Sequence, residues 1–257
     1  MTKRILLTSL IVLLTAGMLV CWFHFAGSHA KRVQRQALCR QVEVILVDSL
    51  ESGIVDKQEV KDYLTRLSVG RQTLSIDLDS IEKALNSRGE IMSAQVYTAD
   101  AQTVTARLTQ RKPVIRLERG EERWYADPEG YLFPVTNTVD VPVVTGRLPL
   151  AVDASWRGPV PAENREWMEG MVALARYIDG REFLRREIAQ IDIDASGDIV
   201  LYARSGGPAI IFGDSSNCAG KFRKLEAWWR NILPSLEGQP YKSINLKYNN
   251  QIICKHL

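Results

Sequence analysis

A long apolar run opens the chain. No Asp, Glu, Lys or Arg occurs from Ile5 to Phe25. A helix rises about 1.5 Å per residue, so a run of this length covers roughly 30 Å, the thickness of the hydrocarbon core of a bilayer. We therefore expect a single transmembrane helix over residues 5–25. A cytoplasmic tail of residues 1–4 precedes it, and a linker over residues 26–38 follows it.

A cleaved signal peptide is the alternative interpretation of the same pattern. Lys3 and Arg4 form a basic start, and Ser28-His29-Ala30 has the small-x-small composition of a cleavage site. The apolar run exceeds the roughly 7 to 15 residues of a usual signal sequence, which favours an anchor that is retained. A secreted periplasmic protein released by cleavage after Ala30 stays open as an alternative.

The pattern of residues 39–112 predicts the order strand, helix, helix, strand, strand. Asp56 and Glu59 have the spacing of a capping box at the start of the first helix, and Asp79 and Glu82 repeat it for the second. The first helix carries one apolar stripe: Val60, Tyr63, Leu64 and Leu67. Runs of apolar and β-branched residues predict strands at 42–47, 91–97 and 103–108.

Residues 113–257 predict a mixed α/β domain whose sheet is covered by helices. Helices are expected at 166–178, where apolar residues fall on one face, and at 220–233, where Pro234 ends the helix. Asp127-Pro-Glu-Gly130 has the composition of a β-turn between two aromatic strands. Strands are expected at 124–126, 131–133, 188–193, 199–203, 208–212 and 243–254, the last with a bend near Asn249-Asn250. The chain is therefore assigned to the α+β class.

Charge argues against nucleic acid as a partner. Of the 33 basic and 30 acidic residues, five basic and no acidic ones lie in the first 35 positions, leaving 28 against 30 in the rest of the chain. A nearly neutral domain region lacks the basic surface that binds nucleic acid.

The four cysteines leave two possibilities open. Cys21 lies in the expected span, and Cys39, Cys218 and Cys254 follow it. A Cys218 to Cys254 disulfide is compatible with an oxidising periplasm, whereas buried free thiols are the simpler interpretation.

One segment imitates a metal site. Asp192-x-Asp194-x-Ser196-Gly197-Asp198 starts like a calcium loop, but the twelfth position, where such a loop needs Glu, is Ala203. The flanking isoleucines alternate as in strands. We interpret the segment as a hairpin turn and expect no metal site.

Catalytic and cofactor chemistry also find no support. The three histidines, His24, His29 and His256, lie at the expected membrane or at the extreme C-terminus. Ser205-Gly206-Gly207-Pro208 joins two expected strands and lacks the helix and Lys of a phosphate loop. We expect no catalytic residues, no cofactor and no small-molecule substrate.

Several segments together resemble the FtsQ/DivIB family of bacterial cell-division proteins. They are Leu74-Ser-Ile-Asp-Leu-Asp79, Ala94-x-Val96, Arg111-Lys112-Pro113, Trp124-Tyr-Ala-Asp-Pro-Glu-Gly-Tyr-Leu-Phe-Pro134 and Val141-Pro-Val-Val-Thr-Gly146. The resemblance implies a POTRA domain at 39–112 and an FtsQ-type β domain at 113–257.

The same resemblance implies a function. It suggests a non-enzymatic, single-pass type II protein of the inner membrane, mostly periplasmic, at the division septum. The β domain would bind FtsB/FtsL-like partners and help to regulate septal peptidoglycan synthesis. The partner-binding residues of the terminal strand would be Ser243, Ile244, Leu246, Lys247 and Tyr248. After Tyr248 this chain departs from the family pattern, with Asn249-Asn250-Gln251 in place of a shorter turn.

Edge-strand pairing is the expected mode of binding, because a strand at the edge of a sheet presents free backbone groups to a partner strand. The terminal strand is expected at such an edge. A POTRA-containing envelope assembly or transport factor is the remaining alternative, although such proteins carry repeated POTRA units or a β-barrel, and neither pattern occurs in this sequence.

Overall fold

The computed structural model describes residues 15, 17–22, 37–47, 53–232, 241–248 and 251–256. The expected cytoplasmic tail, most of the expected span and linker, and the possible cleavage site therefore lie outside the described residues. Thr15 and residues 17–22 are helical. Within the described part of the chain, none of the helices has the length and apolar composition needed to cross a membrane.

The described chain divides into two compact units. The first takes in residues up to 49 together with 56–86 and 93–109, and the second takes the remaining described residues.

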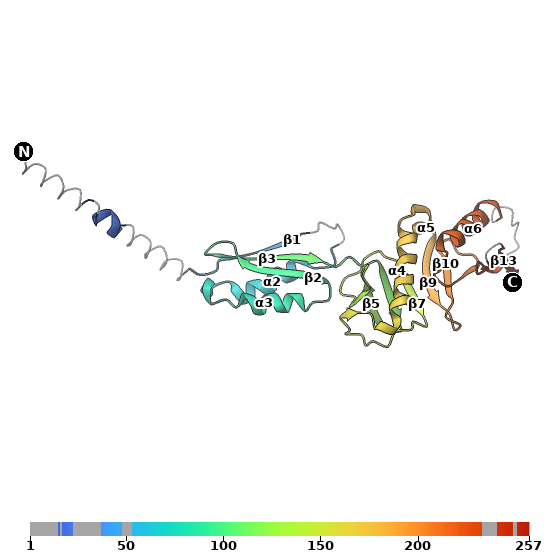
Figure 1. The fold of residues 1–257 in the computed structure, drawn as a ribbon, viewed down its shortest axis with the longest axis horizontal. Coiled ribbons are helices and arrows are strands. Elements are labelled where there is room, and N and C mark those ends of the chain that lie inside the picture. Colours follow the sequence, from blue (N-terminus) through green and yellow to red (C-terminus); the bar gives the residue numbers. More distant parts are fainter. Residues whose placement is uncertain are drawn as a thin grey trace, which may run out of the picture. The chain divides into compact units, whose positions relative to one another are not determined.

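The first unit has the predicted order strand, helix, helix, strand, strand. Its sheet has the order β1-β3-β2, with β1 parallel to β3. Figure 1 shows both helices on the same face of this sheet. The elements are β1 (Gln41–Leu46), α2 (Lys57–Ser68), a 3-10 turn (Thr73–Ser75), α3 (Leu78–Asn86), β2 (Ile91–Thr98) and β3 (Thr103–Gln110). Buried Val60, Leu64, Ile81 and Leu85 of the helices form the core with Val42, Val44, Val104 and Ala106 of the strands.

The predicted cap of α2 is confirmed, and that of α3 was misplaced. Asp56 accepts hydrogen bonds from the N–H groups of Gln58 (2.8 Å) and Glu59 (3.1 Å). At α3 the capping carboxylate belongs to Asp77, which accepts from the N–H of Ser80 at 3.0 Å, so that Asp79 lies inside the helix. That hydrogen bond lowers the pKa of Asp77. Asp77 and Asp79 are both suitable N-cap residues by type, and only the backbone conformation determines which of them caps α3.

The second unit is built on a ten-stranded sheet of order β13-β12-β11-β10-β9-β7-β4-β5-β6-β8. Its strands are β4 (Ile115–Arg119), β5 (Glu122–Ala126), β6 (Tyr131–Pro134), β7 (Val143–Gly146), β8 (Gly158–Pro159), β9 (Ile188–Ile193), β10 (Ile199–Ala203), β11 (Ala209–Gly213), β12 (Tyr241–Asn245) and β13 (Ile253–His256). Its helices are a 3-10 turn (Ala162–Asn164), α4 (Arg165–Asp179), α5 (Glu182–Glu187) and α6 (Cys218–Asn231). The predicted α+β class is confirmed.

Helices α4 and α6 contribute to one continuous core and touch through one pair of aromatic rings. The rings of Tyr177 and Phe222 stack with their centroids 5.0 Å apart. Buried residues of both helices pack with those of the strands, among them Met171, Leu174, Phe222, Ile191 and Leu201. Four elements of this unit were not predicted: β4 alternates with charged residues, and β7, β8 and α5 are only four, two and six residues long.

The calcium-like segment is the hairpin turn that we predicted. Strands β9 and β10 pair antiparallel. Between them the carboxylate of Asp194 accepts from the N–H groups of Ser196 (2.7 Å) and Asp198 (3.0 Å). Among the described residues, no group of three or more His, Cys, Asp and Glu side chains could hold a metal ion. Cys218 and Cys254 are both free thiols.

Candidate partner-binding surface

The terminal hairpin forms one end of the large sheet. Strand β12 pairs with β11 on one side, in parallel, and with β13 on the other, antiparallel. The expectation that the strand carrying Ser243 and Ile244 lies at the edge was therefore wrong. The edge belongs to β13, the next strand along the chain, and no described strand pairs with its outer side.

Two of the five predicted binding residues are core residues. The side chains of Ile244 and Leu246 are fully buried and belong to the main core of the second unit. They fix the position of β12 on the sheet. Ser243 is half-buried and lies opposite Ala209 and Lys255 in the two ladders.

Lys247 is held by an ion pair on the surface. Its Nζ lies 2.7 Å and 3.0 Å from the two carboxylate oxygens of Asp198, in the β9–β10 turn. The hydrogen bond to Asp198 raises the pKa of Lys247. Its backbone N–H donates to the side chain of Asn245 at 2.9 Å. The chain after β12 is thus tied to a neighbouring hairpin.

Lys224 of α6 ties the same segment from the helix side. Its Nζ donates to the carbonyl oxygen of Leu246 at 2.9 Å and to that of Tyr248. Burial, and then the nearby charge of Lys221, lower the pKa of Lys224. These bonds satisfy two carbonyl groups beyond the end of the strand and hold the backbone of Tyr248 in place.

The side chains at the end of the hairpin face solvent. Tyr248 is 49% exposed and Ile253 is 44% exposed. Further along β13, Lys255 and His256 are exposed, and the His256 ring lies 4.5 Å from that of Tyr241. An exposed Tyr on a fixed backbone, beside an edge strand with an exposed Ile, suits binding of an extended partner segment.

The supporting residues of this surface escaped sequence analysis. Lys224 and Asp198 are far from Tyr248 in the chain, and the motif that contains Asp198, the calcium-like segment, gave no sign of a contact with Lys247. The alternating pattern of 243–254 did indicate a strand with a bend, but it could not show which arm of the hairpin would be outermost.

The two adjacent tryptophans of α6 differ in burial. Trp228 is buried in the core, whereas Trp229 is half-buried and meets Phe183 of α5 edge to face, with centroids 5.4 Å apart.

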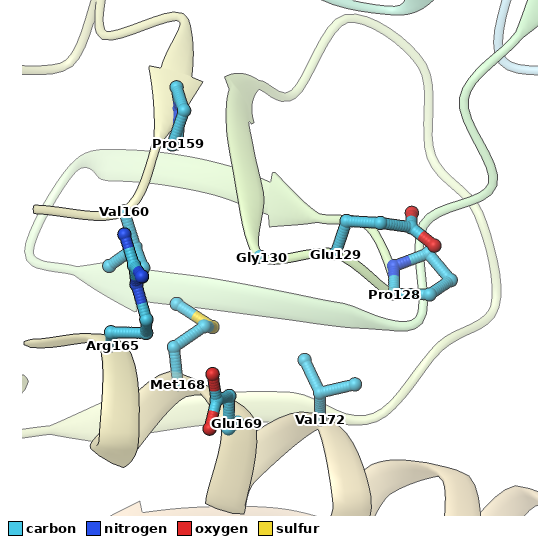
Figure 2. Close-up of a pocket in the computed structure, with 9 residues that line it drawn as sticks. All are labelled: Pro128, Glu129, Gly130, Pro159, Val160, Arg165, Met168, Glu169 and Val172. Carbon is cyan, nitrogen blue, oxygen red and sulfur yellow. The ribbon is translucent and has the colours of Figure 1, made fainter. Parts of the chain in front are cut away.

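A separate pocket of about 330 Å³ lies between the turn before β6, strand β8 and the start of α4. Figure 2 shows Glu129 on the turn, at a distance from Arg165 on the helix, with Met168 between the helix and the strands. The described residues that line it are Pro128, Glu129, Gly130, Pro159, Val160, Arg165, Met168, Glu169 and Val172. This set contains no Ser, Cys, His or Lys side chain, and its titratable groups are Glu129, Glu169 and Arg165.

Comparison with known proteins adds three findings. Residues 37–109 match the POTRA-like domain family, and residues 112–255 match the family described as FtsQ/DivIB, C-terminal related. The chain is also similar to the cell division protein FtsQ of Salinibacter ruber (strain DSM 13855 / M31), with 24% identity over 159 residues. The matched part covers 59% of this chain and 59% of that relative.

Proposed function

Because the chain belongs to the FtsQ/DivIB, C-terminal related family, whose match covers residues 112–255, we propose that it is a non-enzymatic scaffold of the bacterial division machinery. The observation that carries the proposal is the succession of two matches, a POTRA-like domain followed by the FtsQ/DivIB-related domain. The similarity to a cell division protein supports it.

The proposed partners are FtsB/FtsL-like division proteins, and the proposed contact is the terminal hairpin. Strand β13 offers a free edge to an extended segment of the partner, which would gain backbone hydrogen bonds there. Tyr248 would supply the main side-chain contact, because it joins a large apolar ring to a hydroxyl group and is already fixed by Lys224. Lys247 and Ser243 would lie at the rim. Ile244 and Leu246 would act only by holding β12 in the core.

The proposed location is the inner membrane at the division septum. Residues 5–25 would form the single span, in type II orientation, with both units in the periplasm. An anchor confines the protein and its partners to the membrane plane, which raises their effective concentration. Through its partners the scaffold would help to regulate septal peptidoglycan synthesis.

The test is the affinity of the full-length protein for the extracytoplasmic segment of the FtsB homologue of its host. We expect Tyr248→Glu to weaken binding by about 30-fold or more, since a central Tyr contact typically contributes about 2 kcal/mol. The melting temperature should not change, because half of the side chain already faces solvent.

Tyr202→Glu is the matched control. Tyr202 is exposed on β10 of the same unit, away from the terminal hairpin in the strand order. The Tyr202→Glu variant should bind the FtsB segment with the affinity of the wild type. Equal affinity for wild type and Tyr248→Glu would contradict the proposed contact. A large drop in the melting temperature of Tyr248→Glu would show instead that Tyr248 stabilises the fold.

A further inference from the structure

Two side chains of α3 occupy the outer edge of β2. Strand β2 is an edge strand in the sheet of the first unit. The side-chain amide of Asn86 accepts from the N–H of Ala94 at 2.8 Å and donates to the C=O of Ala94 at 3.3 Å. The carboxylate of Glu82 accepts from the N–H of Val96 at 2.9 Å. Three outward backbone groups of this edge therefore have partners from the helix.

The pattern of these bonds is that of a neighbouring strand. In an antiparallel ladder, a residue of one strand exchanges both its N–H and its C=O with the residue opposite, and the next such pair lies two residues on. Asn86 makes both bonds with Ala94, and Glu82 takes the donor two residues further along.

The spacings of helix and strand permit this match. Glu82 and Asn86 are four residues apart on α3, which is about 6 Å along a helix. Ala94 and Val96 are two residues apart on β2, which is about 6.5 Å along a strand. One face of the helix therefore lines up with one row of edge groups.

Among the described residues, the composition of β2 itself gives its edge no further protection. Natural edge strands are commonly guarded by Lys, Pro or bulges, or are covered by another element. The eight residues Ile91–Thr98 include no charged residue and no Pro, and Met92 and Tyr97 are exposed. A strand of this composition is prone to pair with its own kind.

We propose that Glu82 and Asn86 keep the β2 edge closed to strand addition, and that in their absence β2 pairs with β2 of a second copy of the chain. A second copy is the fitting occupant because an uncharged strand places no like charges opposite each other in a two-fold pair. The consequence for the intact protein is that strand addition in the first unit does not use β2.

The first measurement is amide hydrogen exchange, resolved by residue, on the full-length protein. We expect Asn86→Ala to speed exchange of the Ala94 amide, and Glu82→Ala that of the Val96 amide, each by about tenfold or more. The amides of the central strand β3 should stay protected in both variants. Faster exchange across β3 as well, or no change at Ala94 and Val96, would overturn the proposal.

The second measurement is the oligomeric state by analytical ultracentrifugation. The Glu82→Ala/Asn86→Ala double variant should form a concentration-dependent dimer under conditions where the wild type is monomeric. Asp79→Ala/Lys83→Ala is the matched control, because it removes an exposed pair at the same spacing on α3 and should stay monomeric. If the edge amides of the double variant exchange freely but the variant remains monomeric, the proposed pairing of β2 with β2 of a second copy is refuted.

Discussion

Replacing Asp127 with alanine should lower the free energy of unfolding of the second unit by about 3 kcal/mol, because it leaves the largely buried charge of Arg111 without its partner. Asp127 is 2% exposed, and its Oδ2 lies 2.6 Å from Nη1 of Arg111. The guanidinium of Arg111 lies 3.5 Å above the centre of the Tyr131 ring. The Nε atom of Arg111 is buried and has no hydrogen-bond partner among the described residues, so the ion pair with Asp127 is its main polar contact there.

The same carboxylate also shapes the turn before β6. Its Oδ1 accepts from the N–H groups of Glu129 (3.0 Å) and Tyr131 (2.9 Å). Asp127→Asn keeps an acceptor for these donors but removes the charge. We therefore expect Asp127→Asn to lower the free energy of unfolding less than Asp127→Ala does. The difference measures what the hydrogen bonds from Glu129 and Tyr131 contribute.

The measurement is chemical denaturation followed by tryptophan fluorescence. All tryptophans except Trp22 lie in the second unit, so the signal reports on that unit. Glu182→Ala is the control, because Glu182 and Arg186 form an exposed pair at 3.7 Å that should contribute less than about 0.5 kcal/mol. A loss below about 1 kcal/mol for Asp127→Ala would contradict the buried-pair account.

Gly146→Ala should lower the free energy of unfolding of the second unit by about 3 kcal/mol or more. Gly146 has φ +89°, a region that costs residues with a side chain about 1 to 3 kcal/mol. An added Cβ would also lie 2.2 Å from the carbonyl oxygen of Ile193 and 2.8 Å from its nitrogen, both backbone atoms of β9. The contact can be relieved only by moving one strand away from the other.

The position is critical because β7 joins the two halves of the large sheet. It pairs in parallel with β4 on one side and with β9 on the other, where Gly146 lies opposite Ile193. The N–H of Arg147 also donates to the Ile193 carbonyl at 2.8 Å. Displacing β7 therefore weakens the link between the part of the sheet built on β4 and the part that ends in the terminal hairpin.

Gly197→Ala separates strain from contact. Gly197 has a similar φ of +85°, but no heavy atom lies within 4 Å of the place where its Cβ would be. In Gly197→Ala, only the strained backbone conformation should lower the free energy of unfolding, by about 1 to 2 kcal/mol. Denaturation followed by tryptophan fluorescence compares the two variants. Equal losses in the free energy of unfolding would show that the contact between residue 146 and the Ile193 backbone is unimportant.

Local patterns predicted the elements whose signals are contained in a few residues. The Asp56 cap, the hairpin around Asp194 and the apolar faces of α4 and α6 all depend on near neighbours in the chain. The pair formed by Arg111 and Asp127 illustrates the limit. Both residues lie in segments that resemble the family, yet nothing in the sequence indicated that they contact each other.

The candidate surface was predictable only in part. Tyr248 is exposed, as a binding residue must be, whereas Ile244 and Leu246 are buried. Alternation along a strand identifies two faces but not which of them meets α6. Strand order depends on parallel pairings such as β11 with β12, which join segments far apart in the sequence. The closing of β2 by Glu82 and Asn86 likewise depends on where α3 lies.

The most direct test of the scaffold function is the length of cells depleted of the protein in its native host. The account predicts that depleted cells grow into filaments without septa. Re-expression of the wild-type chain should restore division, and re-expression of the Tyr248→Glu variant should restore it poorly. Depleted cells that continue to form septa at normal length would contradict a role in division.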